Sequence, residues 1–266
     1  MVAIHFIRDK CGISAGVQSG IAVPLQAVRY RTGPDKQAFC CVHCRLSQDA
    51  VILPTVHACL AQDYPDDRYD VVVISDHMLP ETNAVLSSLP IKLLQVDFEK
   101  STNTKSLQAA LGYLDKAAYD IALVIDADNI IAPSYLSELN DAFSVSGVRV
   151  VQTHRVAKNL NTGMAYLDAI SEEINNSIFR LGHVNLGMSA ALIGSGMAFE
   201  YPLFYDAMMD NTSVGGFDRV LEMKLLYKAY TSIICRYYRQ GREDTESEQF
   251  LQAAPPLAVR PVLQFL

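Results

Sequence analysis

Five apolar residues, Ile121-Ala122-Leu123-Val124-Ile125, run directly into Asp126-Ala127-Asp128-Asn129. A short run this rich in aliphatic residues predicts a buried strand rather than a helix. Two carboxylates then follow the carboxyl end of a strand, which is where open α/β sheets bind their ligands. One or two carboxylates, completed by substrate phosphates, are typical of Mg²⁺ and Mn²⁺ sites. A polar turn before the helix expected from Pro133 is the alternative, and the spacing alone leaves both open.

Predicted strands and helices alternate on both sides of this stretch. Strands are predicted at 71–74, 91–96, 121–125 and 148–151, and helices at 51–60, 81–88, 101–118, 133 onward, 162–180 and 218–229. This alternation predicts an α/β fold with a mostly parallel central sheet, flanked by helices and joined by right-handed crossovers. The helix at 162–180 is expected to be amphipathic, with an apolar stripe of Met164, Leu167, Ile170, Ile174 and Ile178. Glu172 and Glu173 are interpreted as part of its solvated face.

The composition argues against several classes of protein. Of the 266 residues, 50% are hydrophobic and 19% are charged, so the chain can bury a sizeable core. The net charge of −7 argues against a broad basic surface, and we expect no nucleic-acid partner. No apolar run approaches the roughly 20 residues that span a bilayer, and Arg8, Asp9 and Lys10 interrupt any signal-peptide core. The expected location is the cytoplasm, and peripheral association with the cytosolic face of a membrane stays open.

The pattern divides the chain into three segments. Residues 1–47 show no clean period, residues 48–250 form the orderly domain, and residues 251–266 lose the pattern again. The first segment contains Cys41-Val42-His43-Cys44. Without a secretion signal these cysteines are interpreted as reduced thiols, and a zinc site shared with His57 and Cys59 is the alternative.

Acidic residues follow two predicted strands and begin one predicted helix. These are Asp76, the pair Asp126 and Asp128, and Asp218, with Lys105 near the start of the helix at 101–118. Six stretches in the same order carry a resemblance to a known family: 62–65, 72–76, 105–111, 123–129, 194–198 and 215–222. On these stretches the chain resembles the family 2 glycosyltransferases, inverting enzymes of the GT-A fold, over about residues 48–230.

The resemblance implies a GT-A-like nucleotide-diphospho-sugar transferase fold and a hexosyltransferase-type activity. The donor is expected to be a UDP-sugar and the acceptor a saccharide or a lipid-linked molecule. Asp76 would accept a hydrogen bond from the nucleotide base, Lys105 would lie near the phosphates, and Asp126 would line the nucleotide site. Asp128 would bind Mn²⁺ or Mg²⁺, which neutralises the charge on the departing diphosphate.

The resemblance also implies an acceptor side. Asp218 matches the acid of the family's Glu-Asp-x-x-Leu motif and would be the general base, with Phe217 in place of the Glu and Leu221 retained. The Gly194-Ser195-Gly196 segment would be a loop close to the acceptor, because glycines permit a close backbone approach.

Both ends depart from the family pattern. Residues 44–49 stand where the family usually has Asn-Glu after its first strand, and the chain has no tryptophan for the Gln-x-x-Arg-Trp motif. We therefore expect that a shifted reading frame or a truncation has removed the first strand. The main alternative to an active glycosyltransferase is a catalytically inactive relative. A remoter alternative is a response-regulator receiver domain, suggested by the acid and proline in residues 71–80. A nucleotidyltransferase is a further one, although a Gly-rich basic loop is not visible.

Overall fold

The structure is a computed structural model that describes residues 38–43, 49–144, 148–157, 160–228 and 233–240. Its strands are β1 (Ala38–His43), β2 (Tyr69–Asp76), β3 (Lys92–Val96), β4 (Ile121–Asp126), β5 (Val150–Arg155), β6 (Met197–Glu200) and β7 (Ile233–Gln240). Its helices are α1 (Asp49–Leu60), α2 (Pro80–Ser87), α3 (Asn103–Tyr113), α4 (Tyr135–Phe143), α5 (Gly163–Asn175), α6 (His183–Asn185), α7 (Tyr201–Met209) and α8 (Phe217–Tyr227). A short 3₁₀ helix, η3 (Asp66–Arg68), precedes β2, and a π-helical segment, η4 (Asn176–Gly182), links α5 to α6.

The strands form one sheet in the order β3-β2-β1-β4-β6-β5-β7. Strands β1 to β4 pair in parallel, and β5 pairs in parallel with β7. Strand β6 is antiparallel to both of its neighbours, β4 and β5. The sequence prediction of an α/β fold with a mostly parallel sheet flanked by helices is therefore confirmed, with β6 as the exception. The carboxyl ends of β1, β2 and β4 all lie at one edge of the sheet.

The expectation that the first strand is missing is wrong. Strand β1 lies between β2 and β4 in the middle of the sheet, with Cys41 opposite Val72 on one side and Val124 on the other. Its sequence, Ala38-Phe39-Cys40-Cys41-Val42-His43, lacks the repeated Val and Ile that make a parallel strand recognisable. Residues 1–37, 44–48 and 241–266 lie outside the described part of the chain. The division at residues 47 and 250 stays a prediction.

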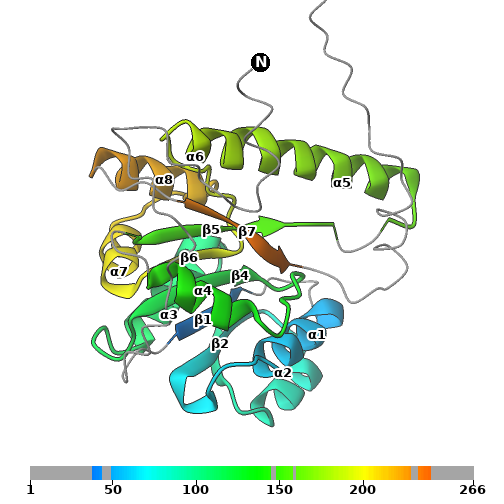
Figure 1. The fold of residues 1–266 in the computed structure, drawn as a ribbon. Helices are drawn as coiled ribbons and strands as arrows, with labels where there is room; N and C mark the ends of the chain where they lie inside the picture. Colours follow the sequence, from blue (N-terminus) through cyan, green and yellow to red (C-terminus); the bar gives the residue numbers. More distant parts are fainter. Residues whose placement is uncertain (1–37, 44–48, 145–147, 158–159, 229–232, 241–266) are drawn as a thin grey trace, which may run out of the picture.

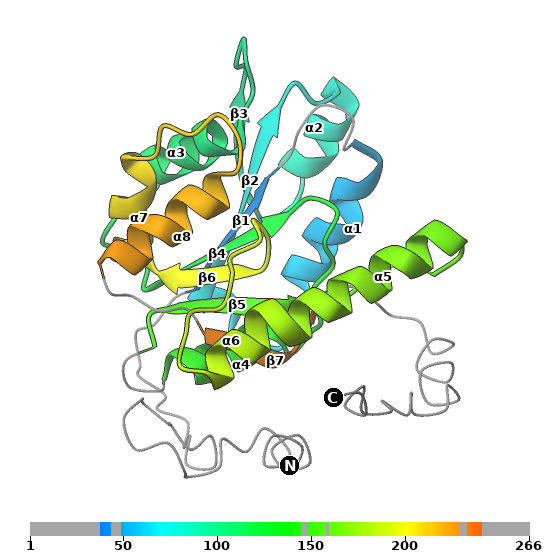
Figure 2. The ribbon, with the colours of Figure 1, turned by 90° about the horizontal axis from the view of Figure 1, so that it is seen from above.

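Strand β4 shows why the sheet is covered on both faces. Ile121, Leu123 and Ile125 belong to one buried cluster, together with residues of α1 and α4. Ala122 and Val124 face the other way into a second cluster, which contains residues of α3, α7 and α8. Figure 2 shows α3, α7 and α8 on one side of the sheet and α1 and α2 on the other. Because both faces of β4 are buried, its sequence is continuously apolar instead of alternating.

Helices α3 and α7 and strand β6 differ from the sequence prediction. Helix α3 begins after Thr102, whose side chain accepts a hydrogen bond from the Lys105 N–H, and it ends at Tyr113 rather than at 118. The Asp115 side chain accepts from the Ala117 N–H just beyond that end, and such a turn competes with a continued helix. Strand β6 and helix α7 are absent from the prediction, because the glycines at 194 and 196 made the stretch resemble a loop.

Helix α5 confirms the predicted helix but leaves its apolar stripe exposed. The exposed fractions are 74% for Met164, 59% for Leu167, 42% for Ile170 and 49% for Ile174, and 55% for Ile178 in the following η4 segment. Among the described residues, α5 has none that is buried. Figure 1 shows α5 running along the top of the molecule, above β5 and β7 and apart from the helices that cover the sheet. None of the described helices is long and apolar enough to cross a membrane.

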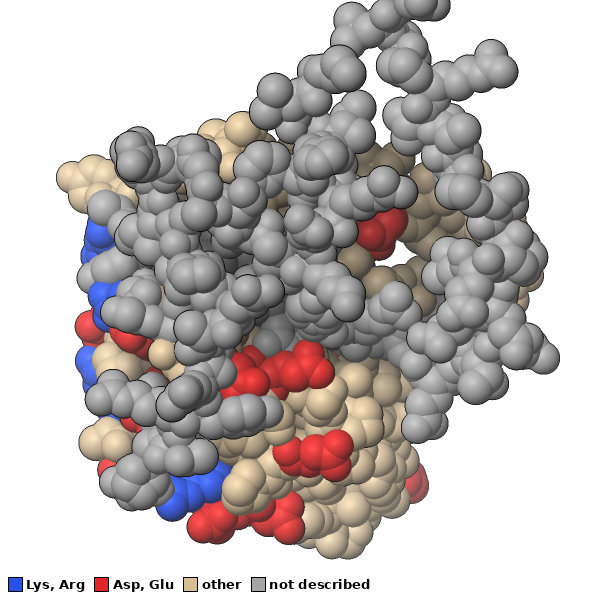
Figure 3. Space-filling view, in the orientation of Figure 1, with Lys and Arg blue, Asp and Glu red and all other residues tan. Residues whose placement is uncertain are grey.

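The prediction that Glu172 belongs to a solvated face is wrong. Glu172 contacts Arg155 of β5 at 3.1 Å and Arg180 of η4 at 2.8 Å, and its side chain is only 18% exposed. The neighbouring Glu173 is 56% exposed and lies 2.8 Å from His154. These contacts hold the carboxyl end of α5 against β5, and periodicity alone cannot reveal partners so distant in sequence. In the orientation of Figure 1, Figure 3 shows that most of the visible acidic side chains of the described surface lie in the lower half of the view.

Candidate active site

The carboxyl ends of β2 and β4 place Asp76 and Asp126 at the same edge of the sheet. Strand β2 ends at Asp76 and β4 ends at Asp126, with β1 between them. His43 of β1 pairs with Ile74 on one side and with Asp126 on the other, so Asp76 extends two residues further. Neighbouring strands lie about 4.8 Å apart, so the two acids are separated by roughly 10 Å across the sheet.

Asp76 is a buried carboxylate that is only partly hydrogen-bonded. Its side chain is 1% exposed, and Oδ1 lies 2.6 Å from Nδ1 of His77 and accepts from the Phe98 N–H at 3.4 Å. Oδ2 is buried without a hydrogen-bond partner among the described residues. Burial acts to raise the pKa of Asp76, but Ser101, the Phe98 N–H and His77 together lower it below its usual value. Asp76 is therefore an ionised acceptor, and it does not cap the following helix.

His77 is a residue at this edge that the sequence analysis did not single out. Its imidazole lies between two carboxylates, with Nε2 2.6 Å from Oδ1 of Asp97 and Nδ1 beside Asp76. Its backbone has a φ of 57°, in the left-handed region that is uncommon for a residue with a side chain. This conformation costs about 1–2 kcal/mol, so the two carboxylate contacts help to hold it. The sequence carries no signal of such a conformation.

Lys105 lies beside the loop that leads from β3 to α3. Its side chain is exposed, Nζ donates to the carbonyl of Lys100 at 2.8 Å, and it lies 5.7 Å from the centre of the Phe98 ring. Phe98 is the residue whose N–H donates to Asp76. Lys105 and Asp76 are therefore brought to the same loop, with Phe98 between them.

The turn after β4 is held by hydrogen bonds to Ser195 and to Thr55. The hydroxyl of Ser195 accepts from the Asp126 N–H at 3.0 Å and from Nδ2 of Asn129 at 2.7 Å. The carbonyl of Ala127 accepts from the hydroxyl of Thr55 at 2.7 Å. Asp128 stands at the exposed tip of this turn, and its carboxylate has no hydrogen bond or ion pair with any residue that the structure describes.

The segment 194–196 approaches this turn through its backbone. Gly194 and Gly196 have φ values of 84° and 63°, which glycine adopts without strain. The Gly196 N–H donates to the carbonyl of Val124 at 2.8 Å. Gln152, which is fully buried, donates to the Ser195 carbonyl at 3.0 Å and accepts from the Ile193 N–H at 3.1 Å. Gln152 was not predicted from the sequence, although a polar residue after the apolar Val150 and Val151 is a usable signal.

Asp218 lies next to the same loop. It is in the first turn of α8, where Gly216 is the N-cap and no side chain makes the capping hydrogen bond. A β-carbon built on Gly194 would lie 3.9 Å from Oδ2 of Asp218. Loop 194–196 therefore connects Asp218 to the turn that holds Asp126 and Asp128. Ser195 is fully buried, so it fixes this arrangement and does not face solvent.

Comparison with known proteins identifies the family. A family model described as glycosyltransferase like family 2 matches residues 39–222. The chain belongs to this family. The match begins within β1 and ends in α8, so it spans every residue named in this site. It also decides against the receiver-domain alternative. No curated protein sequence matches the chain.

Solved structures support the same fold for this family 2 member. Mannosyltransferase PcManGT from Pyrobaculum calidifontis, in complex with GDP-Man and Mn²⁺, has a TM-score of 0.58 and 18% identity, over 78% of this chain and 57% of its own. S. aureus TarS 1–349 in complex with UDP has a TM-score of 0.56 and 16% identity, over 81% of this chain and 62% of its own. The chain thus spans about three fifths of these structures. The shared architecture is the GT-A glycosyltransferase fold.

In this family 2 member the predicted site residues form two groups. Asp76 and Lys105 both flank Phe98 in the loop after β3, whereas Asp126 and Asp128 belong to the turn anchored by Ser195 and Asp218 lies beside Gly194. Both groups lie at one edge of the sheet, on the two sides of β1. Phe217 stands where the family's Glu-Asp-x-x-Leu motif has Glu. It has a structural role here, because it is 5% exposed and packs in the core cluster of α3, α7 and α8.

Proposed function

We propose that this chain transfers a hexose from a nucleoside-diphosphate sugar, a UDP-sugar, to an acceptor hydroxyl with inversion at the anomeric carbon. The observation that carries the proposal is the position of Asp218 beside Gly194, which connects it through Ser195 to the Asp126 turn. A donor held at that turn and an acceptor beside Asp218 would meet at one place. The acceptor is a saccharide or a lipid-linked molecule, encountered in the cytoplasm or at the cytosolic face of a membrane.

The Asp76 group suits the nucleotide. Oδ1 of Asp76 is occupied by His77 and the Phe98 N–H, and the Ser101 side chain lies near the carboxylate, while Oδ2 is buried without a partner at hydrogen-bond distance among the described residues. A buried ionised oxygen is stabilised by an N–H donor, and the N3–H of uracil is such a donor. Lys105 supplies a positive charge near the same loop, where the phosphates of the donor would begin.

The residues of the Asp126 turn fit a divalent cation of the Mn²⁺ or Mg²⁺ class. The described residues contain no group of three or more His, Cys, Asp or Glu side chains that would hold a metal alone. Asp128, an exposed carboxylate without a partner among the residues that the structure describes, matches a site in which the protein supplies one or two carboxylates and the diphosphate supplies other ligands. A bound cation would stabilise the negative charge that develops on the departing diphosphate.

Asp218 suits the role of general base. In a single displacement the acceptor oxygen forms a bond to the anomeric carbon while the bond from that carbon to the diphosphate oxygen breaks. The proton of the acceptor hydroxyl passes to the Asp218 carboxylate, which is not used as a helix cap. No covalent nucleophile is needed on the protein.

Calorimetric titration with UDP, in the presence and absence of Mn²⁺, tests the donor site. We expect binding that depends on Mn²⁺, a loss of at least tenfold in affinity for Asp128→Ala, and no change for Asp66→Ala, a variant at an exposed acid of η3. GDP serves as the second nucleotide. Asp218→Asn is expected to retain UDP binding and to lose sugar transfer. Equal UDP affinity in the wild type and Asp128→Ala would contradict the metal assignment, and a folded chain that binds neither nucleotide would be an inactive relative.

A further inference from the structure

A small cavity is lined by chain neighbours of Gly194 and of the proposed base, Asp218. It has a volume of about 280 Å³ and is lined by Asn175, Phe179, Arg180, Ala191, Ile193 and Arg219. These residues come from the end of α5, from η4, from the segment before Gly194 and from the first turn of α8. Ile193 immediately precedes Gly194, and Arg219 immediately follows Asp218. The cavity is therefore next to the place where an acceptor would lie.

Arg180 is the buried cation of this cavity. Its side chain is 5% exposed, and Nη1 donates to Oε1 of Glu172 at 2.8 Å and to Oδ1 of Asn176. Its Nε is buried without a partner among the described residues. A guanidinium has five N–H donors and is always charged, so these contacts leave donors of Arg180 unused. A buried donor without an acceptor destabilises the protein unless a ligand completes it.

The acidic residues nearby do not neutralise the cavity completely. Glu172 divides its two carboxylate oxygens between Arg155 and Arg180, so one negative charge serves two positive charges. Burial acts to raise the pKa of Glu172, but the two arginines lower it below its usual value, so it is ionised at neutral pH. The three side chains together carry one excess positive charge. Neither Glu172 nor any other carboxylate lines the cavity.

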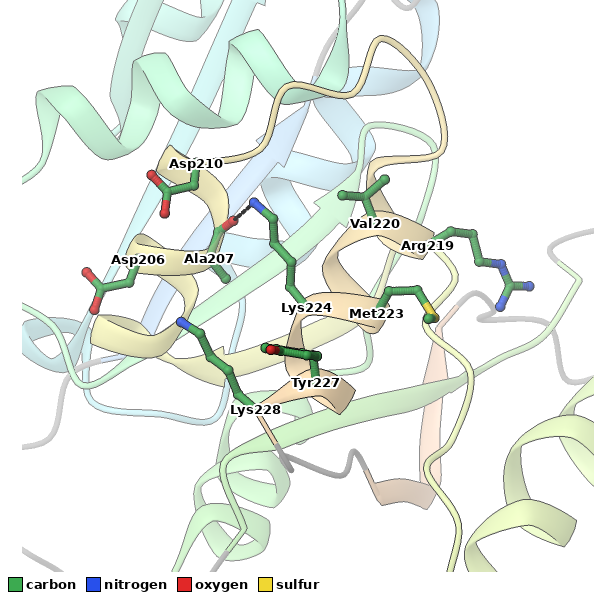
Figure 4. A pocket seen from close by; sticks show the side chains of 9 residues that line it. All are labelled: Asp206, Ala207, Asp210, Arg219, Val220, Met223, Lys224, Tyr227 and Lys228. Carbon is green, nitrogen blue, oxygen red and sulfur yellow. Dashed lines mark hydrogen bonds between the residues drawn. The ribbon is translucent and has the colours of Figure 1, made fainter.

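Arg219 is the exposed cation of the cavity. Its side chain is 65% exposed, and Nη1 lies 3.1 Å from Oε2 of Glu222. The same oxygen of Glu222 accepts from the Leu192 N–H at 3.1 Å, which ties Arg219 to the segment before Gly194. Arg219 also borders a shallow groove between α7 and α8, and Figure 4 shows it at the end away from Asp206 and Asp210, with its guanidinium directed outward. No described residue accepts a hydrogen bond from its other N–H donors, so these are available to a ligand in the cavity.

We propose that this cavity binds an oxyanion, a phosphate or a carboxylate carried by the acceptor, between Arg180 and Arg219. The inference rests on the proposed function, because it assigns the chemical class of acceptor to the same site. Planar guanidinium groups bind both phosphate and carboxylate through paired N–H donors, and the cavity is lined by two such groups, those of Arg180 and Arg219. A neutral acceptor would leave the donors of Arg180 unpaired and is therefore discriminated against. The acceptor selected in this way is acidic, and its reacting hydroxyl lies beside Asp218.

The test uses inorganic phosphate and acetate as probes for the two oxyanions. Binding is followed on the full chain by the NMR signals of the arginine Nε–H groups, with UDP and the diamagnetic cation Mg²⁺ present so that the donor site is occupied. We expect one of the anions to shift the Arg180 signal, and Arg219→Gln to weaken that binding at least tenfold. Lys228→Gln, which removes one positive charge from the end of the same helix, is the matched control and is expected to bind as the wild type does. Arg180→Lys is a second variant, which keeps the charge but loses the planar fork.

The outcomes separate this inference from the proposed function. A wild-type chain that binds neither anion overturns the inference, as does anion binding that is insensitive to both arginine variants. Preference for phosphate over acetate, or the reverse, decides which oxyanion the acceptor carries. UDP affinity is measured on the same samples. If UDP binding fails while Arg219-dependent anion binding persists, the donor assignment is wrong and the anion site remains.

Discussion

Ser195 provides a quantitative test of how the site is held together. Its hydroxyl is fully buried and accepts two hydrogen bonds, one from the Asp126 N–H at 3.0 Å and one from Asn129 at 2.7 Å. Ser195→Ala removes the acceptor and leaves the Asp126 N–H without it. An unsatisfied buried donor costs about 1–3 kcal/mol, and loss of the second bond adds about 1 kcal/mol. We therefore expect the free energy of unfolding to fall by about 2–4 kcal/mol.

Urea unfolding followed by circular dichroism measures this loss. With a dependence on urea of about 2 kcal/mol per molar, the midpoint is expected to fall by about 1–2 M. Ser87→Ala is the control, because the Ser87 hydroxyl donates to the Asn83 carbonyl at an exposed helix end, and we expect a change within about 0.5 kcal/mol. The variant that folds is also expected to bind UDP and Mn²⁺ at least tenfold more weakly, since the Asp128 turn loses its anchor. If the urea midpoint stays within roughly 0.2 M of the wild-type value and UDP binding is unchanged, Ser195 does not anchor this turn.

Three further predictions concern the glycine loop, the buried acid and the core. Gly194→Ala is expected to destabilise the chain by about 1–2 kcal/mol in thermal unfolding, because alanine is strained at a φ of 84°, whereas Gly112→Ala in α3 has open space and is expected to be stabilising. The folded-state pKa of Asp76 is lowered, so its contribution to stability is fully present above its unfolded pKa and is lost as pH falls through the folded value. Urea unfolding between neutral and acidic pH is expected to show this loss in the wild type, and Asp76→Asn is expected to show a shallower dependence. Leu123→Ala in β4, at a fully buried position, is expected to lower the free energy of unfolding by about 2–5 kcal/mol in urea.

The elements that the sequence predicted well are those with a strong local signal. Strands β2 and β4 are continuous apolar runs because both faces are buried, and α5 has apolar residues at helical spacing. Strand β1 has neither signal, since its central position depends on pairing with β2 and β4 rather than on its own composition. Strand β6 is only four residues long and follows two glycines, so a loop was the more natural interpretation.

The site was predictable to the extent that its residues end strands or begin helices. Asp76, Asp126 and Asp218 occupy such positions, and the order of the elements brings them to one edge of the sheet. The supporting contacts of His77 and Gln152 depend on residues distant in the sequence or on an unusual φ, which no local pattern encodes. Arg180 was missed for the same reason, because its burial follows from η4 and from the ion pair with Glu172.

The exposed stripe of α5 has a consequence for the cooperativity of unfolding. Its ion pairs with described residues lie at Glu172 and Glu173, and none of residues 163–170 is buried in the described part of the molecule. An isolated helical segment of this length is marginal in water. In native-state hydrogen exchange, the amides of 163–170 are expected to open with a free energy near zero, whereas those of β4 exchange only through global unfolding. A protease that cleaves the native chain is expected to cut in this half-helix before it cuts the sheet. In the part of the chain that the structure describes, we therefore expect the sheet and its covering helices to form one cooperative unit, and residues 163–170 to open separately from it.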